Sequence, residues 1–306
     1  MTFYKDKICL VTGAGSLGHE LVTLLLERKV REVRIFDNSE QQLYKCELKF
    51  SRDPRVSYLL GDIGYLNDVE MVMPGTELVI HTAASKFVNY IEYHPFQALR
   101  TNVDGAQNIV KAIFRTPSVM KAINISTDKA CNPVSIYGHT KALGERLFTW
   151  ADKVSSKTFC SVRFPNFFGS GGSVIETWMS QGEADLPITV TDKEMTRYFV
   201  SLSLAAEFTL EALEVSEGGD IFVPADVSER SIMDLAEEYA EKYGVSIEFI
   251  GKRLGERLHE VMMTEEEREM ATRVGRFWRI DAKLEYLGTA HYLYDTYRWG
   301  SFSRGV

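Results

Sequence analysis

A glycine-rich turn near the N-terminus limits the fold of this chain more than any other stretch. Residues 7–11 (KICLV) are apolar and predict a strand, and a helix is expected from about Leu17 to Arg28. Between them, residues 12–18 (TGAGSLG) carry three glycines in the spacing G-x-G-x-x-G. Glycines let a backbone approach a pyrophosphate closely, and a helix N-terminus offers it N–H groups. The pattern predicts a dinucleotide-binding βαβ unit; an ordinary glycine-rich turn is the alternative.

An acidic residue follows the second expected strand. Residues 33–36 are apolar enough to form that strand, and they lead into Asp37 and Asn38. Asp37 lies about 20 residues beyond Gly18, where an acid meets the adenosine ribose of a bound dinucleotide. A carboxylate there accepts hydrogen bonds from both ribose hydroxyls and repels a 2′-phosphate. Asp37 therefore favours NAD over NADP as the cofactor; a solvated aspartate at a strand end is the alternative.

Further strands alternate with helical patterns as far as residue 164. They are expected at residues 56–60, 77–81, 122–125 and 159–163. This alternation predicts an α/β fold with a Rossmann-like, doubly wound parallel sheet, whose ligand lies beyond the carboxyl ends of the strands. The residues expected at those ends, besides the glycine loop, are Asp37, Asp62, Ala84 and Thr127.

A Tyr–Lys pair is expected on one helix face. A helical pattern begins near Ser135, and Tyr137 and Lys141 are four residues apart on it, so they share a face. An ammonium near a phenol favours the phenolate, which makes Tyr137 a candidate base at neutral pH. A pair of surface residues is the alternative from spacing alone. The strand end at Thr127 and the glycine loop favour the catalytic interpretation.

Composition excludes several classes of partner. The net charge of −8 argues against a nucleic-acid-binding surface. The four cysteines lie far apart, so neither a zinc site nor another metal site is expected, and their small number fits a reducing compartment. The chain enters a strand almost at once, without a signal peptide, and no apolar run reaches the roughly 20 residues that span a bilayer. We expect a cytoplasmic protein without a membrane partner.

The pattern loosens beyond residue 165, as expected for a smaller, C-terminal substrate-binding domain. We expect residues 1–165 to form the NAD(P)-binding domain, with segments returning from about 195–225, and residues 166–306 to form mainly the substrate domain. Strands are expected at 187–190 and 221–224, and helices at 231–243 and 264–270. The final stretch is rich in Tyr and Trp and is expected to cover apolar surface or contact another subunit.

Four segments together resemble one group of enzymes. They are AASKFVNYIEYHPFQALRTN (83–102), STDKACNPVSIYGHTK (126–141), PITVTDKEMTR (187–197) and GKRLGERLHEVM (251–262). They are similar to the extended short-chain dehydrogenase/reductase superfamily, and within it to inverting UDP-N-acetylglucosamine 4,6-dehydratases of pseudaminic-acid and capsule-polysaccharide biosynthesis. Asp128 and Lys129, directly after Thr127, separate this group from glucose-nucleotide 4,6-dehydratases, which carry Asp-Glu there, and from 4-epimerases.

The resemblance implies a reaction and the residues that perform it. Tyr137, helped by Lys141, removes the proton of the sugar 4-hydroxyl as C4 is oxidised, and Thr127 hydrogen-bonds the 4-oxygen. Lys129, as a neutral amine, then removes the C5 proton while Asp128 protonates the departing 6-hydroxyl. The product is a UDP-4-keto-6-deoxy-HexNAc inverted at C5, and the NAD(P) cofactor is regenerated in each turnover. A homo-oligomer is also implied.

The resemblance also implies binding residues. For the cofactor these are Gly13, Gly15, Ser16, Leu17, Gly18, Asp37, Asn38, Asp62, Ile63, Ala83, Ala84, Lys86, Asn102, Tyr137, Lys141, Phe164 and Asn166. For the UDP-sugar they are Lys86, Asn166, Ser173, Val174, Arg197, Arg253 and Glu256. Arg197 and Arg253 are candidates for a diphosphate clamp, because guanidinium binds phosphate oxygens in pairs; solvated surface arginines are the alternative.

The chain departs from the family pattern at a few positions, and two other functions stay open. The glycine loop is one residue shorter than usual, Pro165 and Gly171 stand where Gly and Arg are common, and Leu254 replaces a Pro. Asp37 and Asn38 replace a Ser-Arg pair that accepts NADP in several relatives. A UDP-sugar 4-epimerase would use Tyr137 and Lys141 without Asp128 and Lys129. A non-catalytic NAD(P)-binding regulatory protein would lack the Tyr–Lys pair.

Overall fold

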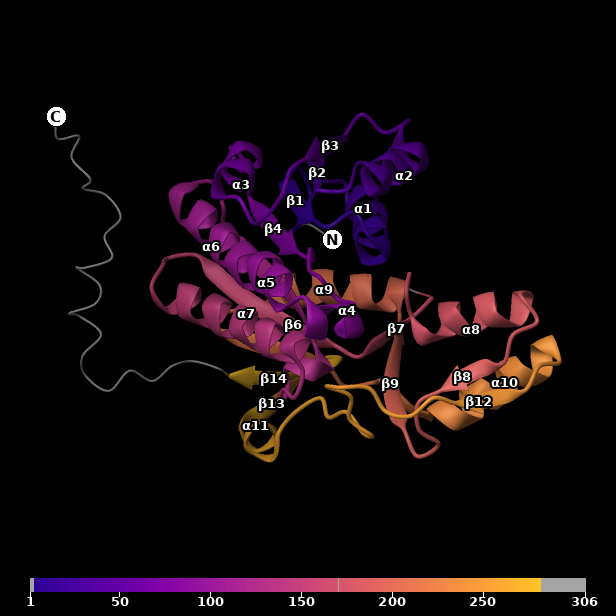
Figure 1. The fold of residues 1–306 in the computed structure, drawn as a ribbon. Helices are drawn as coiled ribbons and strands as arrows, with labels where there is room; N and C mark the ends of the chain where they lie inside the picture. The colour runs from indigo at the N-terminus through magenta and orange to yellow at the C-terminus, as the bar shows by residue number, and fades with distance from the viewer. Residues whose placement is uncertain (1–2, 170, 282–306) are drawn as a thin grey trace.

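The computed structural model describes residues 3–169 and 171–281, which form a layered α/β fold around one large sheet (Figure 1). The sheet has nine strands in the order β13-β14-β10-β6-β5-β4-β1-β2-β3. They are β1 (Ile8–Thr12), β2 (Glu32–Asp37), β3 (Val56–Leu60), β4 (Leu78–His81), β5 (Lys121–Thr127), β6 (Thr158–Phe164), β10 (Asp220–Pro224), β13 (Ala271–Val274) and β14 (Phe277–Asp281).

The strand order confirms the doubly wound fold. The seven strands from β10 to β3 in this order pair in parallel. Beyond β10, β14 and β13 add an antiparallel hairpin at the edge of the sheet. The order 3-2-1-4-5-6 reverses direction between β1 and β4, which is where such sheets bind their ligand. Every strand and helix expected from the sequence is present, and the hairpin of β13 and β14 is an addition.

Helices cover both faces of the sheet, so its central strands are apolar on both sides. In β1, Cys9 and Val11 pack with one layer of helices, and Leu10 packs with the other. The first layer contains α1 (Ser16–Glu27), α2 (Glu40–Phe50) and α9 (Leu202–Val215). The second layer contains α3 (Leu66–Val72), α6 (Gly105–Arg115) and α7 (Ile136–Lys153).

Short helical segments follow the carboxyl ends of β4 and β5. After β4 come α4 (Val88–Tyr93), α5 (Pro95–Ala98) and the π-helical η1 (Leu99–Asp104); after β5 comes one 3₁₀ turn, η2 (Asp128–Ala130). The last helix, α11 (Glu265–Met270), precedes the edge hairpin. A full capping box fixes its start, because the Thr264 side chain and the Glu267 side chain each accept the other's backbone N–H.

A smaller lobe with its own apolar cluster lies beside the sheet (Figure 1). Its elements are β7 (Asn166–Phe168), α8 (Val174–Glu183), β8 (Ile188–Val190), β9 (Thr196–Ser201), β11 (Ser228–Ser231), α10 (Ile232–Tyr243) and β12 (Ile247–Phe249). Because β7 directly follows β6 and pairs with β9, this lobe borders the strand ends. The domain boundaries expected from the sequence stay a prediction, and the Tyr- and Trp-rich stretch beyond Asp281 lies outside the described residues.

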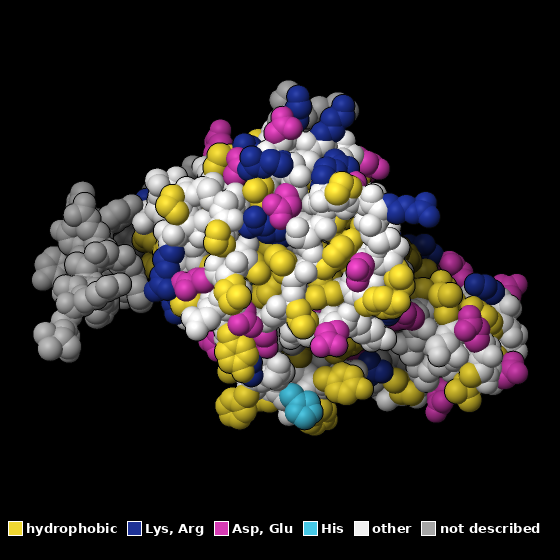
Figure 2. Space-filling model, turned by 90° about the horizontal axis from the view of Figure 1, so that it is seen from above, with side chains coloured by type: hydrophobic (Ala, Val, Ile, Leu, Met, Phe, Trp, Pro, Cys, Tyr) yellow, Lys and Arg dark blue, Asp and Glu magenta, His cyan; other side chains and the backbone are white. Residues whose placement is uncertain are grey.

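The surface mixes charges and carries exposed aromatic side chains. On the face shown in Figure 2, Lys and Arg side chains are interspersed with Asp and Glu, and hydrophobic side chains gather in the middle and lower part of the view. Three aromatic side chains of α4 and α5, Tyr90, Tyr93 and Phe96, are mostly exposed. Across the described residues, no helix combines the length and the apolar character that a bilayer crossing requires.

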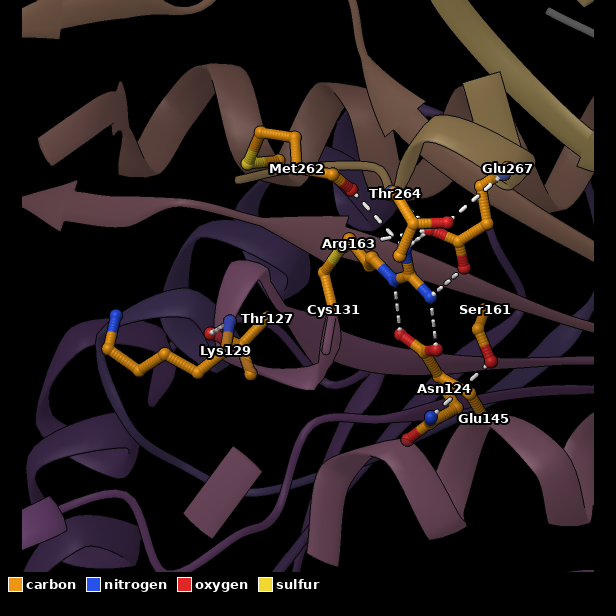
Figure 3. Close-up of polar contacts among 10 residues, drawn as sticks. All are labelled: Asn124, Thr127, Lys129, Cys131, Glu145, Ser161, Arg163, Met262, Thr264 and Glu267. Atoms are coloured by element: carbon orange, nitrogen blue, oxygen red, sulfur yellow. Dashed lines mark hydrogen bonds and ion pairs between the residues drawn. The ribbon is translucent and has the colours of Figure 1, made fainter. Parts of the chain in front are cut away.

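A buried guanidinium ties α7 and α11 to the sheet (Figure 3). Arg163, on β6, donates from Nε and Nη2 to the two oxygens of Glu145 on α7, each at 2.8 Å. It also donates from Nη1 and Nη2 to Glu267 on α11, each at 2.7 Å, and from Nη1 to the Met262 carbonyl at 3.3 Å. Burial raises the pKa of Glu267, but the hydrogen bonds and charge of Arg163 outweigh it and hold this pKa below its ordinary value.

The Arg163 cluster predicts a large loss of stability when its cation is removed. Arg163→Met leaves the buried Glu145 carboxylate without a cation, which costs about 3–5 kcal/mol in comparable pairs. We expect that loss in the free energy of unfolding measured with urea. The triple variant that also carries Glu145→Gln and Glu267→Gln should recover much of it, because both carboxylates of the cluster are then neutral. A single variant as stable as the unmodified chain contradicts this account.

Candidate active site

The predicted catalytic residues meet just beyond the carboxyl end of β5. Thr127 is the last residue of β5, and its hydroxyl donates to Asp128 Oδ1 at 2.9 Å. Lys129 Nζ donates to the same oxygen at 3.0 Å and to Asn166 Oδ1, on β7, at 3.2 Å. The other oxygen of Asp128, Oδ2, is buried without a hydrogen-bond partner in the part of the chain that the structure describes. One polar atom of the cluster is therefore left for a group that the chain does not supply.

Sequence reasoning missed one member of this cluster. Glu260 lies in the loop between β12 and α11, and its Oε1 is 3.7 Å from Lys129 Nζ. Its side chain is only 5% exposed. No motif spacing marks a single acid that reaches the site from so far along the chain. Glu260 lies within the segment 251–262 that resembles the dehydratases, but nothing in that segment distinguishes it from the neighbouring charged residues.

The Tyr–Lys pair lies on α7, whose first turn is fixed from two sides. The Ser135 hydroxyl accepts the backbone N–H of Gly138 at 3.0 Å, and Glu92 Oε1 accepts that of Ile136 at 2.7 Å. Lys141 is buried, and across the described residues its Nζ makes no hydrogen bond. Burial lowers the pKa of Lys141 to about 8, although Glu145 acts in the opposite direction. A buried ammonium without a hydrogen-bond partner among the described residues is a second polar group left for a ligand.

In the protein as it stands, the surroundings of Tyr137 favour the protonated phenol, which is the opposite of the effect predicted for Lys141. The sequence predicted that the lysine would make Tyr137 a base at neutral pH. Burial instead raises the pKa of Tyr137 well above its ordinary value, and the negative charge of Asp128 adds to this; hydrogen bonding with Thr127 only partly offsets it. Spacing on a helix gives a shared face, but the surroundings that set the charge come from the neighbouring strand end.

The glycine loop has the tight geometry that its sequence predicts. Gly13 has a φ of +93°, which favours glycine, and a side chain at Gly18 would meet the Gly13 carbonyl oxygen at 2.0 Å. The Asp37 carboxylate holds the loop, because Oδ2 accepts the Ala14 N–H and Oδ1 accepts the Ser39 N–H, both at 2.7 Å. Asn38 beside it is exposed.

The loop fits the pyrophosphate of a dinucleotide. Gly15 is exposed, and a side chain there would find open space within 4 Å, so the backbone can be approached from outside. Within the described residues no side chain caps α1, which leaves its first N–H groups free for an anion. Asp37 keeps unused lone pairs on both oxygens for ribose hydroxyls. The residues present therefore suit the predicted cofactor.

Asn102 positions two segments of the site. It lies in η1 and is buried, and both of its N–H donors and its oxygen have protein partners: Oδ1 accepts the Ser85 N–H at 2.7 Å, while Nδ2 donates to the Ser85 carbonyl at 3.0 Å and to Thr140 Oγ1 at 2.9 Å. It thus joins the chain after β4 to the helix turn that precedes Lys141. Asn102 was predicted as a cofactor contact, and the structure gives its side chain protein partners instead.

The other predicted cofactor residues fall into two groups: those whose polar side chains contact other parts of the protein, and those whose side chains lie in the core. Lys86 Nζ donates to the Gly171 carbonyl at 2.7 Å, and Ser16 Oγ accepts the Gly171 N–H at 3.5 Å, so the loop after β7 reaches the glycine loop. Asp62 is ion-paired with Arg100 at 3.2 Å. In the second group the side chains lie in the core, so only their backbone can face a ligand: Leu17, Ile63 and Phe164. Ala83 and Ala84 are partly buried after β4.

The two arginines of the expected diphosphate clamp differ in how exposed their side chains are. Arg197 is buried, and its guanidinium donates to the carbonyls of Thr196, Leu258 and Arg257 at 2.7, 2.9 and 2.9 Å. Backbone carbonyls therefore occupy three of its five N–H donors, and the role of Arg197 at a diphosphate stays a prediction. Arg253 is 45% exposed beside Glu256 and remains available as a candidate.

The two remaining sugar-site candidates both lie at the start of α8. Ser173 caps the helix by accepting the Glu176 N–H at 3.3 Å, and Val174 packs against the apolar cluster of the lobe. Among the described residues, no group of three or more His, Cys, Asp and Glu is arranged to hold a metal ion. The four cysteines are free and buried.

A protein family and several relatives match nearly the whole chain. The family model described as "Polysaccharide biosynthesis protein" matches residues 9–282. A UDP-N-acetylglucosamine 4,6-dehydratase (inverting) of Campylobacter jejuni is 34% identical over 292 residues, which cover 93% of this chain and 85% of that protein. A UDP-glucose 4-epimerase of Rickettsia bellii is 33% identical over 303 residues, covering 95% and 88%.

A solved structure shows the same fold at similar identity. The X-ray structure of Pen from Bacillus thuringiensis superposes with a TM-score of 0.89 at 36% identity, covering 92% of this chain and 91% of that one. Both the match to the inverting dehydratase and this superposition confirm the resemblance inferred from the sequence motifs. The epimerase match at nearly the same identity leaves two reactions to be distinguished.

The contacts of Asn102 predict its contribution to stability. Asn102→Asp keeps the shape but removes both donors, and it places a carboxylate against the Ser85 carbonyl. We expect the free energy of unfolding in urea to fall by about 1–3 kcal/mol, the cost of leaving buried polar groups unpaired. Asn89→Asp, at an exposed position of α4, is the matched control and should change stability little. Equal stability of the two variants refutes the positioning role.

Proposed function

The chain belongs to the polysaccharide biosynthesis protein family and is an enzyme, and from that premise we propose that it is a nucleotide-sugar 4,6-dehydratase. The proposed substrate is UDP-N-acetylglucosamine, and the product is a UDP-4-keto-6-deoxy-HexNAc inverted at C5. One observation carries the proposal: Asp128 and Lys129 share a hydrogen bond at the end of β5, and Asp128 Oδ2 is buried without a protein partner among the described residues. An epimerase needs the Tyr–Lys pair but not this acid–base pair.

The cofactor would be held by the glycine loop, by Asp37 and by Lys141. When bound, a nicotinamide cofactor supplies a two-electron acceptor at C4 and returns the electrons at C6, and its oxidised ring adds a positive charge to the site. Lys141 Nζ is free to hold ribose hydroxyls, because it has no hydrogen bond to the described residues. Tyr137 takes the proton of the 4-hydroxyl, and the added positive charge offsets the burial that raises the pKa of Tyr137.

The elimination of water is assigned to Asp128 and Lys129. Lys129 removes the C5 proton, which a 4-ketone makes acidic, and Asp128 gives a proton to the departing 6-oxygen. Both groups come from one short turn after β5, with Nζ and Oδ1 3.0 Å apart. The Asn166 side chain accepts a hydrogen bond from the amine and fixes its direction. A carboxylic acid and a neutral amine at this distance can supply the acid and the base of a single elimination.

For the cofactor we expect NAD to bind more tightly than NADP. Asp37 faces the expected ribose position, and a carboxylate repels a 2′-phosphate. Titration of the cofactor-free protein should give a lower Kd for NAD, and Asp37→Asn should narrow the difference because it removes the charge and keeps the shape. Asp185→Asn, on an exposed loop after α8, should leave the ratio unchanged. NADP binding tenfold tighter than NAD would overturn this assignment.

Replacing Lys129 separates the dehydratase from the epimerase. With UDP-N-acetylglucosamine, Lys129→Ala should still oxidise C4 but should form the 4-keto-6-deoxy product about 10²–10⁴-fold more slowly, the usual contribution of a general base. Nicotinamide absorbance should then report a reduced cofactor that persists. Tyr137→Phe should suppress that signal, because it removes the base for the first step. Lys153→Ala, exposed at the end of α7, is the matched control.

Solvent deuterium gives the second readout of the same experiment. In D₂O the product of the unmodified enzyme should carry deuterium at C5, since Lys129 exchanges that proton, and NMR of the product measures it. A 4-epimer without solvent deuterium, or normal turnover by Lys129→Ala, would assign the chain to the epimerases instead.

A further inference from the structure

The amine of Lys129 is surrounded by three oxygen-bearing side chains. Asp128 Oδ1 lies at 3.0 Å, Asn166 Oδ1 at 3.2 Å and Glu260 Oε1 at 3.7 Å. Asn166 is neutral, and Asp128 changes its protonation in the proposed reaction. Glu260 is the partner that can keep a constant negative charge beside the amine. A carboxylate this well buried interacts strongly with a cation beside it, and Lys129 becomes that cation when it takes the C5 proton.

We propose that Glu260 is a positioning residue for Lys129: its carboxylate fixes the amine and stabilises the ammonium that forms when Lys129 takes the C5 proton. This inference rests on the proposed dehydratase function. The principle is that of a Ser-His-Asp triad, in which a buried carboxylate orients the base and stabilises its charged form. A charge that interacts more strongly with the transition state than with the ground state lowers the barrier.

The proton balance of the step closes with Glu260 ionised throughout. Before elimination, Lys129 is a neutral amine and Asp128 a carboxylic acid. An N–H bond forms as the C5–H bond breaks, the electron pair of that bond becomes the C5–C6 double bond, and the C6–O bond breaks. The Asp128 proton goes to the departing oxygen and gives water. Lys129 is then an ammonium and Asp128 a carboxylate, and proton transfer across their 3.0 Å contact restores the starting pair.

The fold holds Glu260 in place from both sides of its loop. Upstream, Arg197 donates to the Leu258 carbonyl at 2.9 Å; downstream, Arg163 donates to the Met262 carbonyl at 3.3 Å. Figure 3 shows Met262 held at the Arg163 cluster, with the Lys129 side chain extending away from that cluster. The backbone on each side of Glu260 is therefore fixed by a buried guanidinium, although the loop has no regular structure.

Glu260→Gln tests the proposal because it removes the charge and keeps the shape. With UDP-N-acetylglucosamine we expect kcat to fall roughly 10–100-fold, which is less than the roughly 10²–10⁴-fold contribution of the base itself, while KM stays within about twofold. With substrate deuterated at C5, the isotope effect on kcat should rise above that of the unmodified enzyme, because C5 proton removal becomes slower. A purely structural loss would lower the active fraction without changing this isotope effect.

Two further variants complete the experiment. Glu260→Asp should restore part of kcat, because it returns the charge at a longer distance, and it also serves if Glu260→Gln fails to fold. Glu269→Gln, exposed on α11, should match the unmodified enzyme. If Glu260→Gln shows the same isotope effect as the unmodified enzyme, or a kcat within twofold of it, the role of Glu260 is overturned and the proposed function still stands. An unmodified enzyme that forms no 4-keto-6-deoxy sugar overturns the proposed function as well.

Discussion

Parallel strands end at one edge of a sheet, and the site depends on this constraint. The glycine loop follows β1, Asp37 closes β2, Ser85 follows β4, and Thr127 closes β5. These positions are distant in sequence, yet the side chains at neighbouring strand ends touch: Asp37 accepts the Ala14 N–H, and the Thr82 hydroxyl donates to the Thr12 carbonyl. The ends of β1, β2 and β4 therefore form one connected surface before any ligand is considered.

A second requirement is that a charge buried under the sheet must be compensated. Arg163 leaves β6 on the side where α7 and the last described segments pack, and Glu145 and Glu267 together satisfy it. Because α7 also carries Tyr137 and Lys141, the same cluster links the helix of the Tyr–Lys pair to the loop that holds Glu260. Cys131, two residues after Lys129, contacts Glu267 through its sulfur at 3.7 Å. The Arg163 cluster therefore connects the turn that carries Lys129 with the segment that carries Glu260.

The sequence was sufficient wherever a feature is local. The strand–turn–helix at residues 7–18 and the Thr127–Asp128–Lys129 turn follow from patterns within a few residues, and the fold class and the family both follow from such segments. The hairpin of β13 and β14 had a usable signal, because Gly275 with a φ of +54° separates two short strands; it was not recognised.

Environment, by contrast, could not be predicted from spacing. Arg197 has the composition of an anion clamp, but its burial among carbonyls depends on where residues 257–258 return. The pKa of Tyr137 depends on Asp128, which belongs to a different element. Glu260 reaches Lys129 only through tertiary packing. For Arg197 and Glu260 the deciding partner lies far away along the chain, so no short window of sequence contains it.

Residues beyond 255 pack against much earlier parts of the chain: Glu260 lies beside Lys129, and β14 pairs with β10. This order has a consequence for biosynthesis. Strands β1 to β6 can pair while the chain is still being made, since each neighbour in that part of the sheet is already synthesised. Glu260, Glu267 and the β13–β14 hairpin emerge after these strands and must find partners on segments made much earlier, which is a slow, non-local step. A growing chain would thus pair β1 to β6, with Lys129 just beyond β5, before Glu260 can reach its amine.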